Sequence, residues 1–384
     1  MPASLLTASL ALLTAAPAQT FVVDASNGPG TNFTTIIAAI AAVPDGAVLL
    51  VRAGNYHSFT IAGKSLRILG ETGVVVHPPG ASGTSITISG LAQSKTVVLR
   101  DLTVAQGLVT GSTDVTITNC LGPVLLQRVR AGTATSLTTA RLNATDCDRL
   151  LIREHHQTAG TFPFTLTNCN TVVERSFLGF YSGLSFVAGV GVTLNGGTLQ
   201  LIDCCVQGGV DLFGGGTVHA VAMNGGELRL LAGTELQAGF TVSGAVYAVA
   251  GTGNVLFDPS IVMSTPNFAA GVTATSTALP RITTGFTGSV AQVQFDGEPG
   301  QLGAIALALP GPRIIVPGID GAIWLDGATF TPVTLGIFAA GVPITATLPW
   351  AGGAVPAVRA VWQGIAFDPA AGLRVSNPSF VILP

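Results

Sequence analysis

Charged residues gather in one segment of this chain, residues 128–175. Twelve of the 40 Asp, Glu, Lys, Arg and His residues lie in these 48 positions. When the strands of the segment are aligned, Arg128, Glu154 and Arg175 take equivalent outward positions, and Arg130 and His156 follow two residues later on the same face. Because arginine forms paired hydrogen bonds with carboxylates, these five residues predict a surface that binds an acidic or polyhydroxylated polymer. The alternation of charge also fits a structural ladder of ion pairs.

Catalytic chemistry in this segment would have to use Asp148, Arg153 and His156. Asp148 follows an inward cysteine and is expected to point outward, and histidine titrates near neutral pH. Adjacent strand residues point to opposite faces, so only one of His155 and His156 faces solvent. A Ca²⁺ site or an acid/base pair of carboxylates needs several acidic side chains that face one another. One outward Asp supplies neither. We therefore expect an incomplete catalytic site, no metal site and no cofactor; Ca²⁺ stays an open alternative that no residue pattern in the sequence supports.

These residues must be positioned by near-copies of one sequence motif, apolar-x-apolar-x-Asn/Asp followed by a small apolar residue. Period-2 alternation makes each copy a strand, and the Asn or Asp marks a bend at its end. In this interpretation Asp101, Asp146 and Asp203 are turn residues. Irregular spacing near two dozen residues is typical of a solenoid with loops of varying length. The copies are Val97–Leu102, Val115–Cys120, Leu142–Cys147, Phe164–Cys169 and Leu199–Cys204.

The repeated motif resembles that of the right-handed parallel β-helix superfamily, which includes pectate lyases, pectin methylesterases and polygalacturonases. That resemblance covers residues 20–265 and implies the fold, with Asn and Cys or aliphatic ladders running along the coil. The chain departs from the family in its catalytic motifs. It lacks the Asn-Thr-Asp, Asp-Asp, Gly-His-Gly and Arg-Ile-Lys motifs of polygalacturonases and the Gly-x-x-Asp-Phe-x-Phe-Gly motif of the esterases. The resemblance therefore implies a fold and no particular activity.

The start of the coil resembles the family's N-terminal cap. Asn32 can cap a helix whose apolar positions have helical spacing, and the helix ends before Pro44-Asp45-Gly46. A strand at Ala47–Val51 follows. Solenoids need such a cap because an exposed terminal turn is an open strand edge. The apolar positions of the helix are Phe33, Ile36, Ile37 and Ile40.

The five cysteines predict buried thiols. Four of them are the last residue of a copy of the motif, and together they are expected to form an inward ladder. Stacked strands are about 4.8 Å apart, whereas a disulfide needs Cβ atoms about 3.8 Å apart. Cys205 alone is expected to face outward. The inward cysteines are Cys120, Cys147, Cys169 and Cys204.

The chain divides into four segments by pattern. Residues 1–18 are expected to be a signal peptide, because an apolar run precedes Ala16-Pro17-Ala18. Residues 19–265 form the β-helix with its cap, 266–298 a linker, and 299–384 a small β-sandwich. The sandwich is predicted from apolar runs separated by Gly/Pro turns, at 304–309, 313–316, 322–325, 332–338, 342–348, 358–367 and 379–383.

The sandwich carries the three tryptophans of the chain, Trp324, Trp350 and Trp362. Indole rings stack on sugars and also fill sandwich cores, so two roles are open. The sequence thus predicts an all-β chain: a right-handed parallel β-helix solenoid with a short N-terminal capping helix, followed by a small C-terminal β-sandwich.

Composition narrows the function. Charged residues make up 9% of the chain and the net charge is −3, which gives no electrostatic reason to expect nucleic acid. No stretch suggests an integral membrane protein. We expect a secreted or cell-surface protein that binds polysaccharide without a complete catalytic site and attaches to the surface through its C-terminal domain. The alternatives are a polysaccharide lyase or glycoside hydrolase of the pectate-lyase-like group, and a structural or adhesive surface protein.

Overall fold

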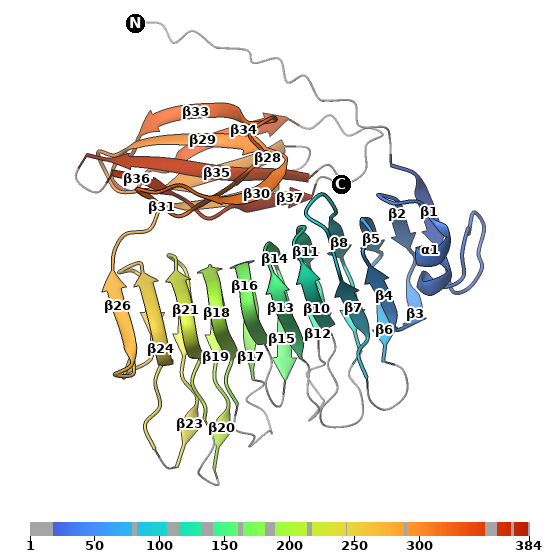
Figure 1. Cartoon of the computed structure of the whole chain (residues 1–384), viewed down its shortest axis with the longest axis horizontal. Helices are drawn as coiled ribbons and strands as arrows, with labels where there is room; N and C mark the ends of the chain where they lie inside the picture. The colour runs from blue at the N-terminus through green and yellow to red at the C-terminus, as the bar shows by residue number, and fades with distance from the viewer. Residues whose placement is uncertain are drawn as a thin grey trace, which may run out of the picture.

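Short parallel strands stack turn upon turn into a coil, and a β-sandwich lies along one side of it (Figure 1). The computed structural model describes residues 18–78, 83–105, 115–131, 141–159, 164–180, 189–212, 217–242, 244–287, 290–349, 359–369 and 372–382. The expected right-handed parallel β-helix followed by a small sandwich is confirmed. The expected signal peptide lies, except for Ala18, outside the described residues. Within the described ranges, no helix is long and apolar enough to cross a bilayer.

Each turn of the coil contributes strands to three faces, whose bounds are as follows. The first face holds β4 (Phe59–Ala62), β7 (Ile86–Ser89), β10 (Val115–Cys120), β13 (Leu142–Cys147) and the first halves of β16 (Phe164–Glu174), β18 (Val192–Ile202), β21 (Val221–Leu230) and β24 (Val249–Phe257). The second face holds β1 (Thr20–Val23), β2 (Val48–Val51), β5 (Leu66–Gly70), β8 (Val97–Arg100), β11 (Val124–Gln127), β14 (Leu150–Arg153), the second halves of the same four long strands, and β26 (Val272–Ser276). The third face holds β3 (Gly54–His57), β6 (Val74–His77), β9 (Thr103–Val104), β12 (Arg130–Ala131), β15 (His156–Ala159), β17 (Phe177–Phe180), β19 (Cys205–Gln207), β22 (Glu235–Gln237) and β25 (Val262–Met263). A small extra pair, β20 (Val210–Asp211) and β23 (Phe240–Thr241), extends from the coil.

Alternation along each strand fills the coil. On the first face, Ile88, Ile117 and Leu166 point inward and are fully buried, while the threonines beside them point outward. The parallel registers keep inward residues stacked over inward residues from one turn to the next. One continuous apolar core therefore runs along the coil.

The N-terminal end is covered by α1 (Ile36–Ala42), as the sequence predicts, but with a different cap. Thr35 is the N-cap residue, since its hydroxyl accepts a hydrogen bond from the Ala38 amide at 3.1 Å. Asn32 instead accepts from the Val22 amide at 2.8 Å and fixes the chain entering the helix. Ile36 is buried, whereas Ile37 is half exposed, so the expected apolar face is narrower than predicted.

The cysteines are free, and Cys120, Cys147, Cys169 and Cys204 are buried, as predicted. Three of them stack in one column between the first and second faces, because Cys120 pairs with Cys147 and the next turn supplies Cys169. Cys204 is not in this column. It follows the bend after the second face, where the inward positions of successive turns are Leu102, Val129, His155, Ser176 and Cys204. The same sequence motif ends strands on two different faces, and aligning its copies placed Cys204 wrongly in the column of the other three cysteines.

The sandwich consists of two sheets around a core that includes Phe295 and Trp362. One sheet is β27 (Arg281–Thr287), β28 (Val290–Asp296) and β34 (Ile344–Pro349); the other is β31 (Ile319–Asp320), β36 (Gly372–Val375), β35 (Arg359–Asp368), β29 (Leu302–Ala308), β33 (Thr331–Ile337) and β37 (Ser379–Ile382). A ribbon of β30 (Pro310–Ile315) and β32 (Ala322–Leu325) accompanies them.

The expected linker at 266–298 is wrong in its bounds. β26 is the last strand of the coil, and β27 and β28 belong to the sandwich. These strands lack apolar runs: β26 is mostly exposed Thr and Ala, and β28 alternates Gln with apolar residues. Only about four residues, 277–280, connect the two domains.

The sandwich covers the outer side of the second face. There the outward residues Val98, Leu125, Leu151 and Val172 form an apolar column that packs, within one buried cluster, with Trp324 and Phe380 of the sandwich. Figure 1 shows the sandwich lying along these strands. The second face is thus an interface between domains, while the first and third faces lie away from the sandwich.

Candidate functional site

Five polar residues stack at the bend between the second and third faces. Each follows the last outward residue of a second-face strand, and each has a positive φ of 47–58°. This left-handed conformation turns the chain sharply and points the side chains away from the coil. We call this set the ionic corner: Asp101, Arg128, Glu154, Arg175 and Asp203.

The predicted ladder of charges is present in the ionic corner and longer than expected. Arg128 donates to both carboxylate oxygens of Asp101, at 2.5 and 2.8 Å, and to Glu154 at 3.3 Å. The Asp101 carboxylate raises the pKa of Arg128. Glu154 lies 3.9 Å from Arg175 Nη2. At the other end, Asp203 accepts from Arg281 of the sandwich at 2.8 Å. The turn residue Asp101 is therefore a member of the ladder, whereas the turn residue Asp203 pairs with the sandwich.

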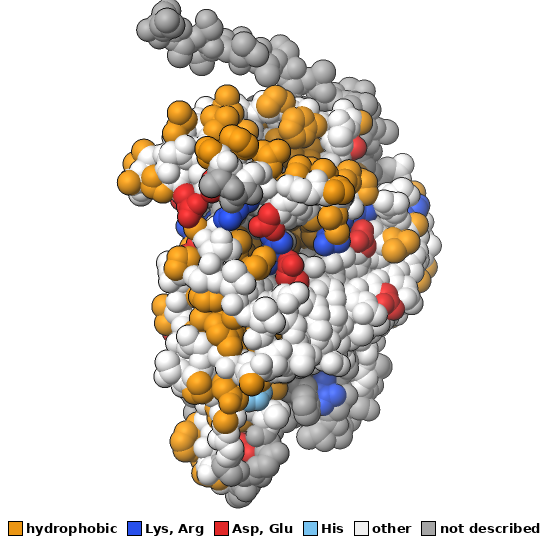
Figure 2. All heavy atoms as spheres, turned by 60° about the vertical axis from the view of Figure 1, so that its left-hand side comes forward, with side chains coloured by type: hydrophobic (Ala, Val, Ile, Leu, Met, Phe, Trp, Pro, Cys, Tyr) orange, Lys and Arg blue, Asp and Glu red, His pale blue; other side chains and the backbone are white. Residues whose placement is uncertain are grey.

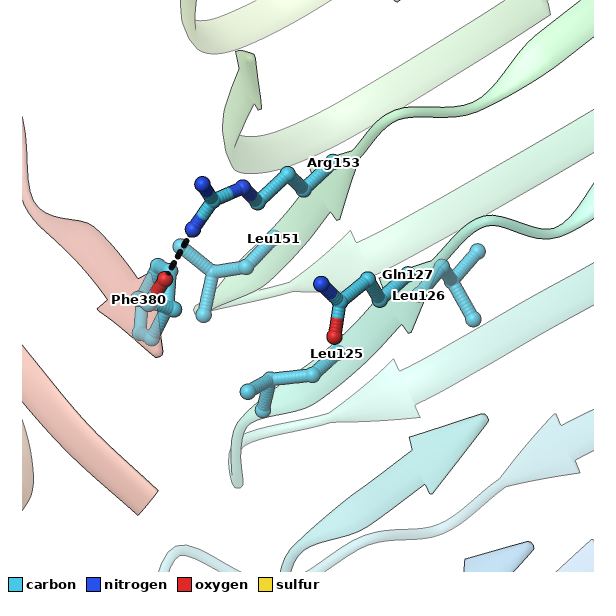
Figure 3. A pocket seen from close by; sticks show the side chains of 6 residues that line it. All are labelled: Leu125, Leu126, Gln127, Leu151, Arg153 and Phe380. Atoms are coloured by element: carbon cyan, nitrogen blue, oxygen red, sulfur yellow. Dashed lines mark hydrogen bonds between the residues drawn. The ribbon is translucent and has the colours of Figure 1, made fainter. Parts of the chain in front are cut away.

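Arg153, a candidate catalytic residue, lies under the sandwich. It is 8% exposed and donates to the Thr284 hydroxyl at 2.8 Å, to the Thr284 carbonyl at 2.5 Å and to the Phe380 carbonyl. Figure 3 shows its side chain reaching toward Phe380 beside Leu151. The interpretation of Arg153 as a catalytic residue is not supported by this placement, because its donors are used in holding two domains together.

Glu174 is the residue that sequence reasoning missed. It occupies the position of Arg153 one turn further on and is 2% exposed. The Ser379 hydroxyl donates to it at 3.0 Å, and Arg175 lies 3.1 Å from its other oxygen. Burial raises the pKa of Glu174 to about 7, although Arg153 and the Ser379 hydrogen bond act in the opposite direction. The strand alignment would have placed Glu174 beside Arg153, but only the sandwich makes it buried.

Arg130 and His156 lie together on the third face, in register with each other and exposed. The His156 ring stacks on Phe177 with centroids 5.2 Å apart and planes at 22°. Partial burial and the neighbouring Arg130 lower the pKa of His156. His155 points into the coil, where its Nε2 lies 3.1 Å from Gln157 Oε1, and burial lowers its pKa to about 4. One histidine of the pair faces solvent, as predicted.

Asp148 stands apart from the other two catalytic candidates. It lies at the bend between the first and second faces, where Asn170 donates to it at 3.3 Å and the buried Arg149 approaches to 3.7 Å. Arg153 is on the second face and His156 on the third. The three candidates therefore face in different directions, and the structure does not bring them together as one site.

Two hollows accompany the domain interface. One, lined by Leu125, Leu126, Gln127, Leu151, Arg153 and Phe380, has a volume of about 20 Å³, room for about one water molecule (Figure 3). The other has a volume of about 190 Å³ and lies where the ionic corner meets the sandwich. We call it the corner recess; it is lined by Arg175, Asp203, Thr283, Thr284, Gly285, Gln292 and Gln294.

Metal ligands and tryptophans add no further site. Among the described residues, no three His, Cys, Asp or Glu side chains are grouped so as to hold a metal ion. Trp362 is in the sandwich core and Trp324 is buried against the coil, so these two fill cores and do not present a sugar-stacking surface. Trp350 lies outside the described residues.

Comparisons with known proteins give similarities among solved structures only. No protein-family model matches the sequence, and no curated protein sequence matches it. Solved pectin methylesterases are similar to the chain. One in complex with a hexasaccharide has 15% identity over 71% of this chain and 84% of its own, with a TM-score of 0.35. The enzyme from Yersinia enterocolitica has 13% identity over 64% and 94%, with a TM-score of 0.39. The enzyme from Erwinia chrysanthemi has 14% identity over 71% and 84%, with a TM-score of 0.35.

Proposed function

We propose that this is a secreted or cell-surface protein that binds polysaccharide along the ionic corner and the adjoining third face. One observation carries the proposal: Arg175, at the end of the half-exposed ladder of Arg128, Glu154 and Arg175, lines the corner recess of about 190 Å³, and the ring of His156, two residues after Glu154, stacks on Phe177 on the adjoining third face. Charged and amide groups hydrogen-bond sugar hydroxyls, and aromatic faces stack on sugar rings. A polymer chain crossing successive turns of the coil would meet all three features.

Binding is tested by affinity electrophoresis and calorimetry with a panel of neutral and uronate-containing polysaccharides. We expect the wild type to bind at least one of them, and the double variant Arg128→Ala, Arg175→Ala to bind about tenfold more weakly. His156→Ala should also weaken binding without touching the sandwich. Lys95→Ala is the control, because Lys95 pairs with Asp45 near the N-terminal cap. Equal binding by all of these variants would assign the ladder to the scaffold.

The alternative, an enzyme of the pectate-lyase-like group, would centre on Glu174. Its pKa of about 7 is suitable for a general acid, but it lies under Ser379 and the rest of the sandwich. Catalysis would therefore require the sandwich to move away. Incubation of the same panel with the protein and Ca²⁺, with assays for unsaturated products and reducing ends, separates this alternative from binding alone.

A further inference from the structure

The corner recess has a floor without a side chain. Gly285 lies in β27, and a Cβ placed on it would meet no other atom within 4 Å. Gln292 pairs with Gly285 and Gln294 with Thr283 across β27 and β28, so the side chains of Thr283, Gln292 and Gln294 surround the open position on one side of the sheet. Arg175 and Asp203 of the coil complete the opposite wall. The recess is a built cleft between domains, with a volume of about 190 Å³.

The formal charges around this recess are balanced. Five arginines and five carboxylates form two networks of ion pairs at the corner and under the sandwich, one around Glu154 and Glu174 and one around Arg281, so each described charge of the set has an opposite partner. On the face that Figure 2 shows, charged side chains gather along the line where the sandwich meets the coil. The members of the set are Arg100, Arg128, Arg153, Arg175, Arg281, Asp101, Glu154, Glu174, Asp203 and Asp296.

A balanced set does not attract a polyanion. A uronate carboxylate entering the recess would have to compete with Glu154 and Glu174 for Arg175, and it would be repelled by Asp203, which is paired with Arg281. A neutral sugar meets no such competition, because its hydroxyl groups both donate and accept. Gln292, Gln294 and Thr283 offer donors and acceptors, Asp203 offers an acceptor and Arg175 offers donors. Alternating donors and acceptors around a shallow recess suit adjacent hydroxyl groups on one ring.

We infer that the corner recess binds one neutral sugar residue of a polysaccharide through adjacent free hydroxyl groups, and that the balanced corner discriminates against uronates. This inference rests on the proposed function and names its ligand class. The ring lies over Gly285, with its hydroxyl groups toward Gln292, Gln294, Asp203 and Arg175. The rest of the polymer extends along the ionic corner.

The test uses Gly285→Val, which fills the recess from its floor. Neither a positive φ nor a neighbouring atom opposes this change, and valine suits a strand. Gly327→Val is the matched control, because Gly327 also has open space and no positive φ and lies in a sandwich turn that does not line the recess. Gln294→Ala is a second variant, on an exposed position whose truncation leaves the fold intact.

Binding is measured by calorimetry with oligosaccharides of β-1,4-glucan, mannan and galactan, and with oligogalacturonate. We expect a neutral oligosaccharide to bind the wild type with an affinity that changes less than about twofold between about 50 and 500 mM salt. Gly285→Val should weaken that binding at least about tenfold, Gln294→Ala should weaken it about threefold, and Gly327→Val should leave it unchanged.

Two results would overturn the inference while leaving polysaccharide binding in place. One is binding of oligogalacturonate alone with a steep salt dependence; the other is unchanged binding by both Gly285→Val and Gln294→Ala. If the wild type binds none of the neutral or uronate polymers, the proposed function itself fails, and the inference fails with it.

Discussion

Two corners of this coil have the same backbone conformation but differ in most of their side chains and in their surroundings. Asn119, Asp146 and Asn168 form an Asn/Asp corner between the first and second faces, with φ values of 53–54°. The residues of the ionic corner have φ values of 47–58°. Asn and Asp adopt this left-handed conformation readily, whereas Arg and Glu adopt it at a cost of about 1 kcal/mol or more. The bend is thus a local property of the chain, whereas the type of residue found there depends on the groups around it.

Those surroundings are the sandwich. The Asn/Asp corner is exposed, and two of its own members are hydrogen-bonded, Asn168 donating to Asp146 at 3.2 Å. The ionic corner borders the domain interface, where Arg175 reaches the Thr284 carbonyl and Asp203 reaches Arg281. This position accounts for part of the charge density of residues 128–175, because Arg149, Arg153, Glu174 and Arg175 all contact the sandwich.

The largest effect should come from Arg153→Ala, at the interface rather than at either corner. This change leaves Glu174 buried with one fewer cation and removes three hydrogen bonds to the sandwich. Removing one partner of a buried ion pair costs roughly 3–5 kcal/mol. Thermal unfolding and limited proteolysis at the connection 277–280 should both show a loosened sandwich.

Arg130→Ala is the matched control for Arg153→Ala. Arg130 is an exposed arginine on the third face, and its truncation should change the free energy of unfolding by less than about 0.5 kcal/mol. An Arg153→Ala protein as stable as Arg130→Ala would show that the sandwich is held by its apolar contacts alone.

The next effect is a pH dependence caused by Glu174. Its pKa is raised from 4.5 to about 7 in the folded protein, so the folded state holds a proton that the unfolded state has lost between these pH values. The contribution of this group to stability is therefore complete below about pH 4.5, decreases as pH rises through 7 and stays low above it. The total change is about 3 kcal/mol. The unfolding free energy of the wild type minus that of Glu174→Gln, measured from pH 5 to 8.5, should fall by an amount of this order. The difference is used because His155, whose pKa burial lowers to about 4, makes both proteins more stable as pH rises toward 6.5.

Glu174→Gln checks that the dependence belongs to this residue. The amide keeps an acceptor for the Ser379 hydroxyl and does not titrate. The variant should lose the decrease in stability that Glu174 causes between pH 5 and 8.5. A variant with the same pH dependence as the wild type would place the titration elsewhere.

The coil could be predicted from the sequence because its signals are local. Alternation in Val115–Cys120 and its copies, and the bend after each, depend only on neighbouring residues. The ladder of Arg128, Glu154 and Arg175 followed from aligning those copies. The burial of Arg153 and Glu174 could not be predicted, because it depends on Thr284, Ser379 and Phe380, which are more than 100 positions away in the chain.

Strands without apolar runs were the other feature that the sequence analysis did not predict. β28 alternates Gln with apolar residues, and β27 contains three threonines and a glycine, so neither strand has an apolar run and both were predicted to be linker. The corner recess consists partly of these strands and was therefore missed. Each of its residues is ordinary in sequence, and their meaning comes from facing Arg175 across the domain boundary.

The smallest effect returns to the two corners and asks what holds Arg128 in its costly conformation. Asn168→Gly and Arg128→Gly give both corners the same residue, one that favours positive φ. Relief of backbone strain and the greater freedom of the unfolded chain nearly cancel, so Asn168→Gly should change the free energy of unfolding by less than about 0.5 kcal/mol.

Arg128→Gly relieves about 1 kcal/mol more backbone strain than Asn168→Gly, but it loses the ion pairs with Asp101 and Glu154, each worth about 0.2–1 kcal/mol at this half-exposed position. The two variants should therefore be equally stable to within about 0.5 kcal/mol in chemical denaturation. The difference between them measures the contribution of the ion pairs minus the extra strain of Arg128. If Arg128→Gly were more stable than Asn168→Gly by about 1 kcal/mol, the ion pairs would not offset the strain of Arg128, and the structural ladder would no longer account for an arginine at this bend. Ligand binding would then be the stronger explanation, and the polysaccharide measurements would decide it.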